Sequence, residues 1–214
     1  MIPELVDEDA LRSRLAATLG AVGAGAASAG IATDVTVRYG EAHRAYHTLR
    51  HVAECLKWFD ETRGLAREAE AVELAIWFHD VVYDPKQPDN ERRSGEFAAK
   101  ALVSGGVDGA LAERVRLLVL ATAHDDAERA GDAALLCDID LSILGSSHWR
   151  FVEYEGQVRR EYAHVTDDEF RAGRLRVVRA FAVSDRIYRT EYFADRLEID
   201  ARLNIGRSIR RLGG

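Results

Sequence analysis

The positions of the prolines limit most strongly what this chain can form. Pro3 lies near the start, Pro85 and Pro88 lie close together, and no other proline occurs among the 214 residues. Proline removes a backbone donor and ends helices, so the long stretches on either side of Pro85 are open to helix. In those stretches apolar residues recur at helical spacing, and no run alternates cleanly with a period of two. The sequence therefore predicts an all-α protein, a helical bundle.

Local start and stop signals divide the chain into expected helices. Asp7 and Asp108 suit N-cap positions, and Thr166 with Glu169 forms a capping box. The two neighbouring prolines place a loop between the third and the fourth helix. The expected helices cover residues 7–20, 42–59, 65–82, 90–102, 108–124, 149–162, 170–183 and 193–212, with a short apolar segment at 133–144.

Length and charge limit the class of protein. A chain of 214 residues suits one domain that can bury a core without metal or disulfide staples. Its hydrophobic fraction of 47% and charged fraction of 30% are those of an ordinary globular protein. The formal net charge of −7 argues against a nucleic-acid polymer as a partner, because phosphate contacts need a basic face.

Cysteine usage and the N-terminal residues bear on the compartment. Cys55 and Cys137 form no CxxC pair and fall in apolar segments, which favours free thiols in a reducing cytoplasm. The acidic N-terminal segment lacks the basic residues of a signal peptide. The longest uncharged run, 15–33, is too rich in glycine and alanine to be a convincing membrane span. We therefore expect a soluble cytoplasmic protein with no membrane partner.

The glycine-rich stretch 20–30 has the composition of a phosphate-binding loop but not its pattern. Ser28 occupies the place of the third glycine in GxGxxG, and the stretch follows an expected helix instead of a strand. We expect a linker or a loosely packed helix of small residues.

Three segments carry histidines and carboxylates suited to one divalent-metal site. His47 and His51 are four residues apart in an expected helix, so they would share one face. His79 and Asp80 are adjacent at the end of a second apolar segment, and Asp140 comes from a third. Imidazole and carboxylate donors without thiolates suit Mn, Fe, Co, Ni, Zn or Mg. The sequence therefore predicts a divalent metal ion as cofactor.

The same segments resemble a known family. YHTLRH at 46–51 is similar to the YHNxxH segment in the cyclic-nucleotide phosphodiesterase branch of the HD superfamily, a group of all-helical, metal-dependent phosphohydrolases. WFHDVVYD at 77–84 supplies the His-Asp pair of that superfamily, and DLS at 140–142 resembles the segment of its last aspartate ligand. The resemblance implies His47 as the general acid and, as metal ligands, His51, His79, Asp80 and Asp140.

A wider resemblance covers most of the chain from Arg38 onward. RAYHTLRHV, NERRS, DIDLSILG, VRREY and DARLNI look like segments of a small bacterial group of predicted HD phosphohydrolases. This implies a single HD-type domain over 1–214, with an N-terminal helix and Gly/Ala-rich extension at 1–34 and the HD core with C-terminal helices at 35–214. Thr48 and Ile139 replace the Asn and Ala of the branch's motifs, so nothing assigns the chain to cyclic nucleotides.

Several site assignments stay open. Asp138 competes with Asp140 as the last ligand, although the DLS context favours Asp140. Arg44 suits either a substrate phosphate or an ordinary surface position. His124 is the first choice for an additional catalytic group, and as the only histidine between Asp80 and Asp140 it cannot supply a full second metal shell. Weaker candidates are Tyr83, Asp84, Asn90 and Glu91.

Together these features predict a metal-dependent phosphohydrolase that directs a metal-activated water at a small phosphorylated compound, for which a nucleotide is one option. The alternative is a metal- or nucleotide-binding regulatory module with little or no catalysis. The last expected helix carries an apolar stripe that suits packing on the chain's own core or on a second copy of the chain, formed by Leu197, Ala201, Ile205 and Ile209.

Overall fold

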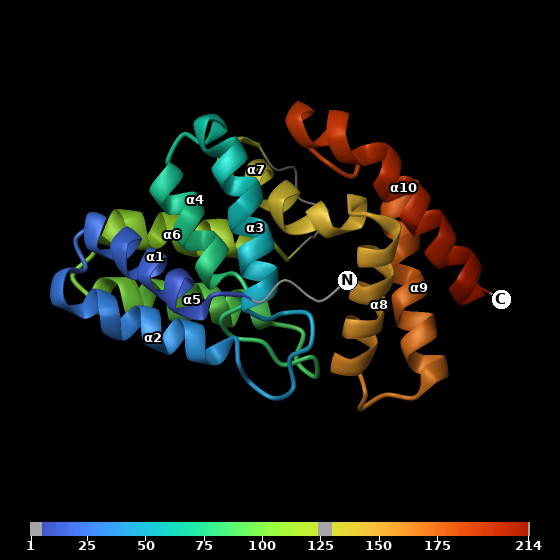
Figure 1. Cartoon of the computed structure of the whole chain (residues 1–214), viewed down its shortest axis with the longest axis horizontal. Helices are drawn as coiled ribbons and strands as arrows, with labels where there is room; N and C mark the ends of the chain where they lie inside the picture. Colours follow the sequence, from blue (N-terminus) through green and yellow to red (C-terminus); the bar gives the residue numbers. More distant parts are fainter. Residues whose placement is uncertain (1–5, 124–129, 214) are drawn as a thin grey trace. The chain divides into compact units, whose positions relative to one another are not determined.

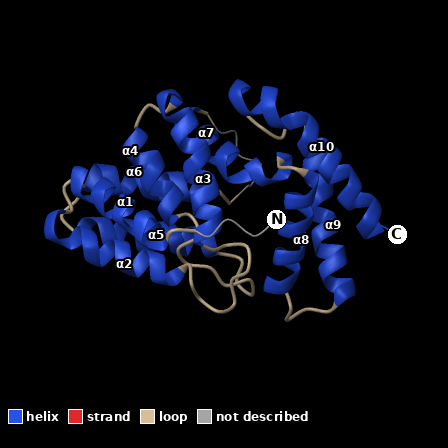
Figure 2. Cartoon of the chain, in the orientation of Figure 1, coloured by secondary structure: helices blue, strands red, loops and turns tan. Residues whose placement is uncertain are grey.

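The computed structural model describes residues 6–123 and 130–213, and within these ranges it contains helices, turns and loops but no strand (Figure 2). The all-α prediction is confirmed for this part of the chain, and the HD type of all-α fold stays a prediction. Contacts divide the chain into two compact units, Met1–Leu136 and Cys137–Gly214. We call them the first and the second unit and describe each by itself.

The first unit is a set of packed helices around a central one (Figure 1). The central helix, α4 (Ala69–Phe78), is buried at every position from Ala71 to Phe78 and packs against four neighbours. A helix that is apolar on nearly all sides must be covered on all sides. The neighbours of α4 are α1 (Glu8–Ala21), α3 (Leu49–Thr62), α5 (Asn90–Ser104) and α6 (Gly109–Ala121).

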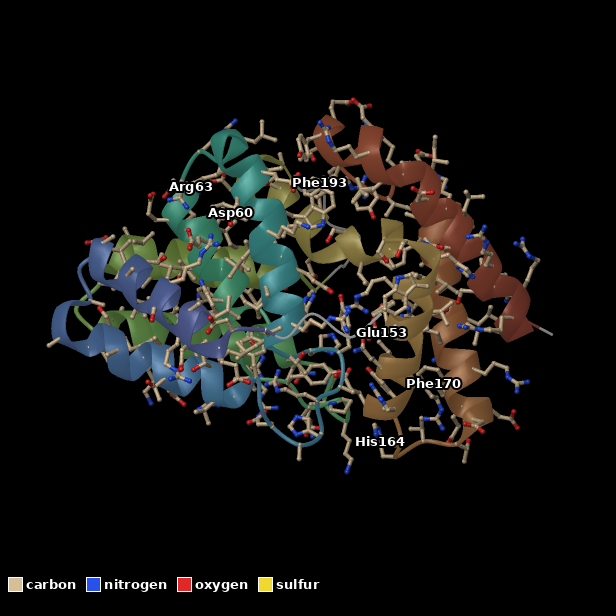
Figure 3. All side chains as sticks on the ribbon, in the orientation of Figure 1. Asp60, Arg63, Glu153, His164, Phe170 and Phe193 are labelled. Atoms are coloured by element: carbon tan, nitrogen blue, oxygen red, sulfur yellow. The ribbon has the colours of Figure 1, made fainter. Side chains whose placement is uncertain are left out.

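The one carboxylate buried in α4, Glu73, is neutralised by arginines from two other segments. Its Oε1 accepts hydrogen bonds from Arg14 Nε at 2.9 Å and Thr18 Oγ1 at 3.1 Å, and its Oε2 accepts one from Arg63 Nη1 at 2.6 Å. Arg14 also binds Asp60, which Figure 3 labels together with Arg63. A buried charge is tolerated when it is paired and hydrogen-bonded in this way, so the cluster fixes α1 and the end of α3 on α4.

The glycine-rich stretch 20–30 forms a tight connection between packed helices. It contains the end of α1, a 3₁₀ turn (Gly25–Ala27) and the start of α2 (Ser28–Arg38). Gly23 and Gly106 have φ angles of +100° and +94°, and a Cβ on either would lie 3.8 or 3.5 Å from the carbonyl oxygen of the other. The glycines therefore allow two turns to meet backbone to backbone.

The N-terminal helices belong to the core of the first unit. Leu15, Leu19, Ala32 and Val35 are fully buried, and α1 packs on α4 as well as on α2. Residues 8–34 are therefore not an extension beside the core. None of the described helices combines the length and the apolar composition needed to cross a bilayer.

The second unit contains the end of α7 (Gly131–Asp140), a 3₁₀ helix η3 (Leu141–Gly145), α8 (His148–Glu161), α9 (Asp167–Val183) and α10 (Glu191–Gly213). The long helix α10 packs on η3 and α9 with Leu197, Ala201 and Ile205 buried. These three residues of the predicted apolar stripe thus pack on the chain's own core, and packing of the stripe on a second copy stays a prediction.

Several helix ends match the sequence prediction and others do not. Asp7 and Asp108 cap α1 and α6, and Thr166 with Glu169 forms the capping box of α9. The predicted helix 42–59 begins only at residue 49, and the predicted helix 65–82 spans only 69–78. The late start at residue 49 falls next to the candidate site and has the cause described below.

Candidate metal centre

His79 lies directly after the last residue of the central helix, Phe78, as the C-cap of α4. Its Nδ1 is 2.8 Å from the carbonyl oxygen of Ile76. A carbonyl oxygen only accepts, so Nδ1 carries the proton, and the lone pair of the neutral ring is on Nε2. A hydrogen bond of this kind is what usually orients a metal-binding histidine. The negative end of the α4 dipole also favours a cation at this helix end.

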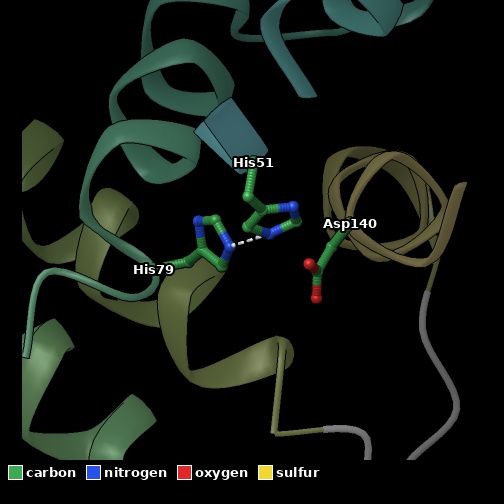
Figure 4. Close-up of side chains that lie close together, drawn as sticks. All are labelled: His51, His79 and Asp140. Atoms are coloured by element: carbon green, nitrogen blue, oxygen red, sulfur yellow. Dashed lines mark hydrogen bonds between the residues drawn. The ribbon is translucent and has the colours of Figure 1, made fainter. Parts of the chain in front are cut away.

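His51 lies in the first turn of α3, after Thr48 at the N-cap, and its side chain is 2% exposed. Its Nε2 lies 3.0 Å from Nε2 of His79 (Figure 4). Cys55, one turn further along α3, places Sγ 3.7 and 3.8 Å from the two nitrogens of the His51 ring. Because the two distances are nearly equal, the sulfur atom does not point at either nitrogen alone. We therefore describe the interaction as a sulfur–aromatic contact. The sequence analysis did not place Cys55 at the candidate site, although its spacing of four residues from His51 could have indicated this position.

Asp80 completes a triangle of donor atoms within the first unit. Its Oδ2 lies 3.0 Å from Nε2 of His79 and 3.7 Å from Nε2 of His51. Two donors that are each about 2.1 Å from a common ion lie about 3.0 Å apart at a right angle and about 3.4 Å apart in a tetrahedral arrangement. The three separations therefore suit neighbouring ligands of one divalent cation, and the residues present fit the predicted group.

The charge of Asp80 depends on the same histidines. Burial opposes ionisation of this carboxyl, but positive charge on His79 and His47, the hydrogen bond with His79 and positive charge on His51 together hold its pKa below the ordinary 3.8. Because metal ligands must be deprotonated, binding of an ion by these atoms would depend on pH.

His47 lies in the turn before α3, so the expectation that His47 and His51 share one helical face is wrong. The two rings nevertheless remain neighbours, with centroids 6.1 Å apart. The His47 ring stacks on Tyr83 at 4.1 Å and meets the edge of Tyr46 at 4.9 Å. Tyr83, one of the weaker candidates, thus orients His47.

The contacts of Arg44 explain why α3 does not start at residue 42. They also show that the interpretation of Arg44 as a substrate-binding residue is wrong. The Arg44 side chain is 0% exposed. It donates to the carbonyl oxygens of His47 at 3.1 Å, Asp80 at 2.8 Å and Val81 at 3.2 Å, and its Nε binds Glu41. These bonds hold the irregular turn before α3 against the segment that follows α4. If the turn were helical, the carbonyl oxygen of His47 would not face the Arg44 guanidinium in this way. Arg44 is a structural residue of the site.

Tyr39 supports the end of α4 from another side. Its hydroxyl donates to the carbonyl oxygen of Trp77 at 2.9 Å, which satisfies one of the carbonyls that a helix end leaves unpaired. Burial, reinforced by the nearby charge of Asp80, raises the pKa of Tyr39 well above 10, so the phenol keeps the proton that it donates.

The loop after Asp80 is held by residues that the sequence offered as weak site candidates. Asn90 exchanges hydrogen bonds with the backbone of Asp84, and the Asp84 carboxylate accepts from Lys86 N at 3.0 Å. The Ser94 hydroxyl both accepts from Val82 N and donates to Val82 O, each at 3.1 Å. Asp84 and Asn90 therefore shape the loop, and Glu91 lies in the first turn of α5, where the helix dipole favours a carboxylate.

In the second unit, Asp138 has a structural role. Its Oδ1 accepts from Arg189 N at 2.8 Å, and its Oδ2 accepts from Thr190 N at 2.7 Å and Thr190 Oγ1 at 2.6 Å. Burial raises the pKa of this carboxyl, although these hydrogen bonds oppose the shift. With both oxygens committed to the segment before α10, Asp138 is no longer a competitor for the last ligand position. Asp140, the last residue of α7, is drawn with the two histidines in Figure 4.

Two further findings concern the last predicted site residue and the similarity of the chain to known proteins. His124, the predicted additional catalytic group, lies outside the described residues. No protein-family model, curated protein or solved structure matches this chain.

Proposed function

We propose that the chain is a metal-dependent phosphohydrolase whose divalent ion is held by His51, His79, Asp80 and Asp140. The observation that supports the proposal is the triangle of His51 Nε2, His79 Nε2 and Asp80 Oδ2, with separations of 3.0, 3.0 and 3.7 Å. The assignment of Asp140 follows from the sequence resemblance and from the commitment of Asp138 to Arg189 and Thr190.

The expected chemistry is hydrolysis of a phosphoester. When bound, a divalent ion lowers the pKa of a coordinated water and polarises a phosphoryl oxygen. His47 is the proposed general acid, because its imidazole lies beside that of His51 and is held by stacking on Tyr83. Proton donation to the leaving oxygen by such a group typically contributes about 10²–10⁴-fold to the rate.

A small phosphorylated compound is the substrate class that this arrangement favours. The net charge of −7 gives no long-range attraction for a polyanion, and Arg44 is committed to backbone carbonyls. Recognition of phosphate would therefore depend mainly on the ion.

The first experiment measures the metal. Protein depleted with chelator and then titrated with Mn²⁺, Co²⁺ or Ni²⁺ should bind one ion tightly by calorimetry, and Asp80→Asn or His79→Gln should weaken binding at least about tenfold. His164→Gln is the matched control, because His164 is an exposed histidine of the second unit. Equal affinity in the wild type and in both site variants would contradict the proposal.

The second experiment measures turnover. The loaded protein should release nitrophenol from bis(nitrophenyl) phosphate or nitrophenyl phosphate, and His79→Gln should lose this activity while His164→Gln keeps it. His47→Gln should bind metal normally but lower kcat, since only proton donation is removed. A loaded protein that holds its ion but turns over no substrate across a broad panel of phosphoesters would support the regulatory module instead.

A further inference from the structure

The second unit contains a cavity that the proposed metal chemistry does not use. It measures about 400 Å³ and lies between the C-terminal part of α8, the turn that follows and the first half of α9. Small-molecule sites typically enclose roughly 300–1,000 Å³. The described residues that line it all belong to the second unit.

Most of the cavity wall is apolar, and several interactions hold it in place. Val158 and Tyr162 on α8, Val165 in the turn, and Phe170 and Val177 on α9 form this wall. The rings of Tyr162 and Phe170 have centroids 6.0 Å apart. The wall is therefore present without a ligand, which lowers the entropy that binding would cost.

The turn beside the cavity is fastened from outside by Arg159. Its guanidinium lies 5.0 Å from the centre of the Phe170 ring, donates to the carbonyl oxygens of Tyr162 and Val165, and binds Asp167 at 2.6 Å. Figure 3 shows Phe170 near this end of α9.

Two arginines interrupt the apolar wall. Arg174 and Arg176, both on α9, line the cavity, and the Arg174 guanidinium lies 4.9 Å from the centre of the Tyr154 ring. Among the described lining residues the one carboxylate is Glu169, which accepts from Thr166 N at 2.9 Å and Thr166 Oγ1 at 2.7 Å in the capping box of α9. Two guanidinium groups against one carboxylate leave an excess of positive charge among the described lining residues, which favours an anion.

Gly173 keeps the cavity open. It lies in the interior of α9, where glycine costs roughly 0.5–1 kcal/mol relative to alanine. A Cβ at this position would meet only Arg176 Nη2, at an ordinary contact distance of 3.8 Å. Neither the packing nor the backbone of α9 requires glycine at position 173. A larger side chain there would instead occupy space in the cavity.

We propose that this cavity binds an amphipathic anion, with its apolar body against Val158, Phe170 and Val177 and its carboxylate, sulfonate or phosphate group at Arg176 and Arg174. Guanidinium groups suit such anions because their donors form a planar fork.

The proposal is tested with anilinonaphthalene sulfonate as a fluorescent probe on the metal-free full-length protein, and with decanoate as competitor. The wild type should bind one probe molecule saturably, and decanoate should displace it while decanol displaces it at least about tenfold less effectively. Gly173→Leu should weaken binding at least about tenfold, because its side chain fills the cavity. Arg176→Glu should weaken it about tenfold, because it reverses the charge facing the anion.

Two matched controls separate the cavity from general effects. Gly156→Leu changes an exposed glycine of α8 that does not line the cavity, and Arg171→Glu reverses a charge on α9 outside it. Both controls should bind like the wild type. Absence of saturable binding in the wild type, equal weakening in the controls, or equal displacement by decanol and decanoate would overturn the proposal. If Gly173→Leu does not fold, the test is the difference in probe affinity between Arg176→Glu and Arg171→Glu. Equal affinities of these two variants would overturn the proposal.

Discussion

At the scale of single residues, Asp138 has a structural role, whereas Asp140 is a proposed metal ligand. The carboxylate of Asp138 is fully buried and accepts three hydrogen bonds from Arg189 and Thr190. Asp140 is only partly buried and ends α7. Their substitution should therefore affect different properties of the protein.

We expect Asp138→Asn to lower the free energy of unfolding by about 1–3 kcal/mol, because the new amide group faces N–H donors that it cannot accept from. Asp140→Asn should lower that free energy less than Asp138→Asn does, because Asp140 is only partly buried, but it should weaken metal binding. Urea unfolding and metal titration of both variants give the comparison. Loss of metal affinity in Asp138→Asn with unchanged stability would reverse the two assignments.

Asp80 predicts a pH dependence of stability in the metal-free protein. Its pKa in the folded chain lies below the ordinary 3.8, so its ionised form stabilises the fold. This contribution is present above about pH 4 and is lost as the pH falls through the folded pKa. The difference in unfolding free energy between the wild type and Asp80→Asn should thus be largest above about pH 4 and shrink as the pH falls below it. A difference that grows on acidification would contradict the role of the histidines.

The sequence predicted the three residues of the triangle but not what positions them. Residue type indicated a metal site, and the resemblance to the HD superfamily singled out His51, His79 and Asp80 as its ligands. The bonds from Arg44 to the carbonyl oxygens of His47 and Asp80 were not predictable, because backbone acceptors leave no trace in the pattern of side chains. The same holds for Asp138, whose partners are 51 and 52 residues away.

At the scale of elements, close helix packing in the second unit depends on Gly145 at the end of η3. A Cβ at this position would lie 2.6 Å from Leu197 Cβ and 2.8 Å from Leu197 O on α10. No rotamer change relieves a contact with backbone. Gly145 is therefore what lets α10 approach η3.

Gly145→Ala should lower the free energy of unfolding by about 1–3 kcal/mol, since α10 must move away from η3. The matched control is Gly206→Ala within α10, where the added Cβ meets only the flexible end of Arg210 at 3.7 Å. That control should raise stability by about 0.4–1 kcal/mol through its effect on the unfolded chain. Thermal and urea unfolding of both variants test the pair, and equal stability of Gly145→Ala and the wild type would refute the packing argument.

Element boundaries were predictable where a side chain satisfies the local backbone. Asp7, Asp108 and the Thr166–Glu169 pair bind N–H groups within three residues of themselves, so the sequence contains the whole interaction. The start of α3 was not predictable, because the buried guanidinium of Arg44 draws the preceding turn away from helix. Tertiary hydrogen bonds there outweigh local propensity.

At the scale of the whole molecule, three of the proposed ligands belong to the first unit, and Asp140, which the sequence resemblance implies as the last ligand, belongs to the second. A ligand that binds only the folded state stabilises every segment that its site requires. Hydrogen exchange should therefore slow on metal loading in α3 and at the end of α4, and also at the end of α7. In Asp140→Asn the protection should remain in the first unit and be lost at the end of α7. Protection confined to the first unit in the wild type would remove Asp140 from the ligand set.

The Arg44 anchor has a consequence for protein engineering. A designer who grafts the His51, His79 and Asp80 triad onto another helical scaffold by copying only those side chains would leave behind the guanidinium that clamps both backbone segments. The graft must include Arg44 together with the turn that contains His47. Without them, the three proposed ligands will not keep their spacing.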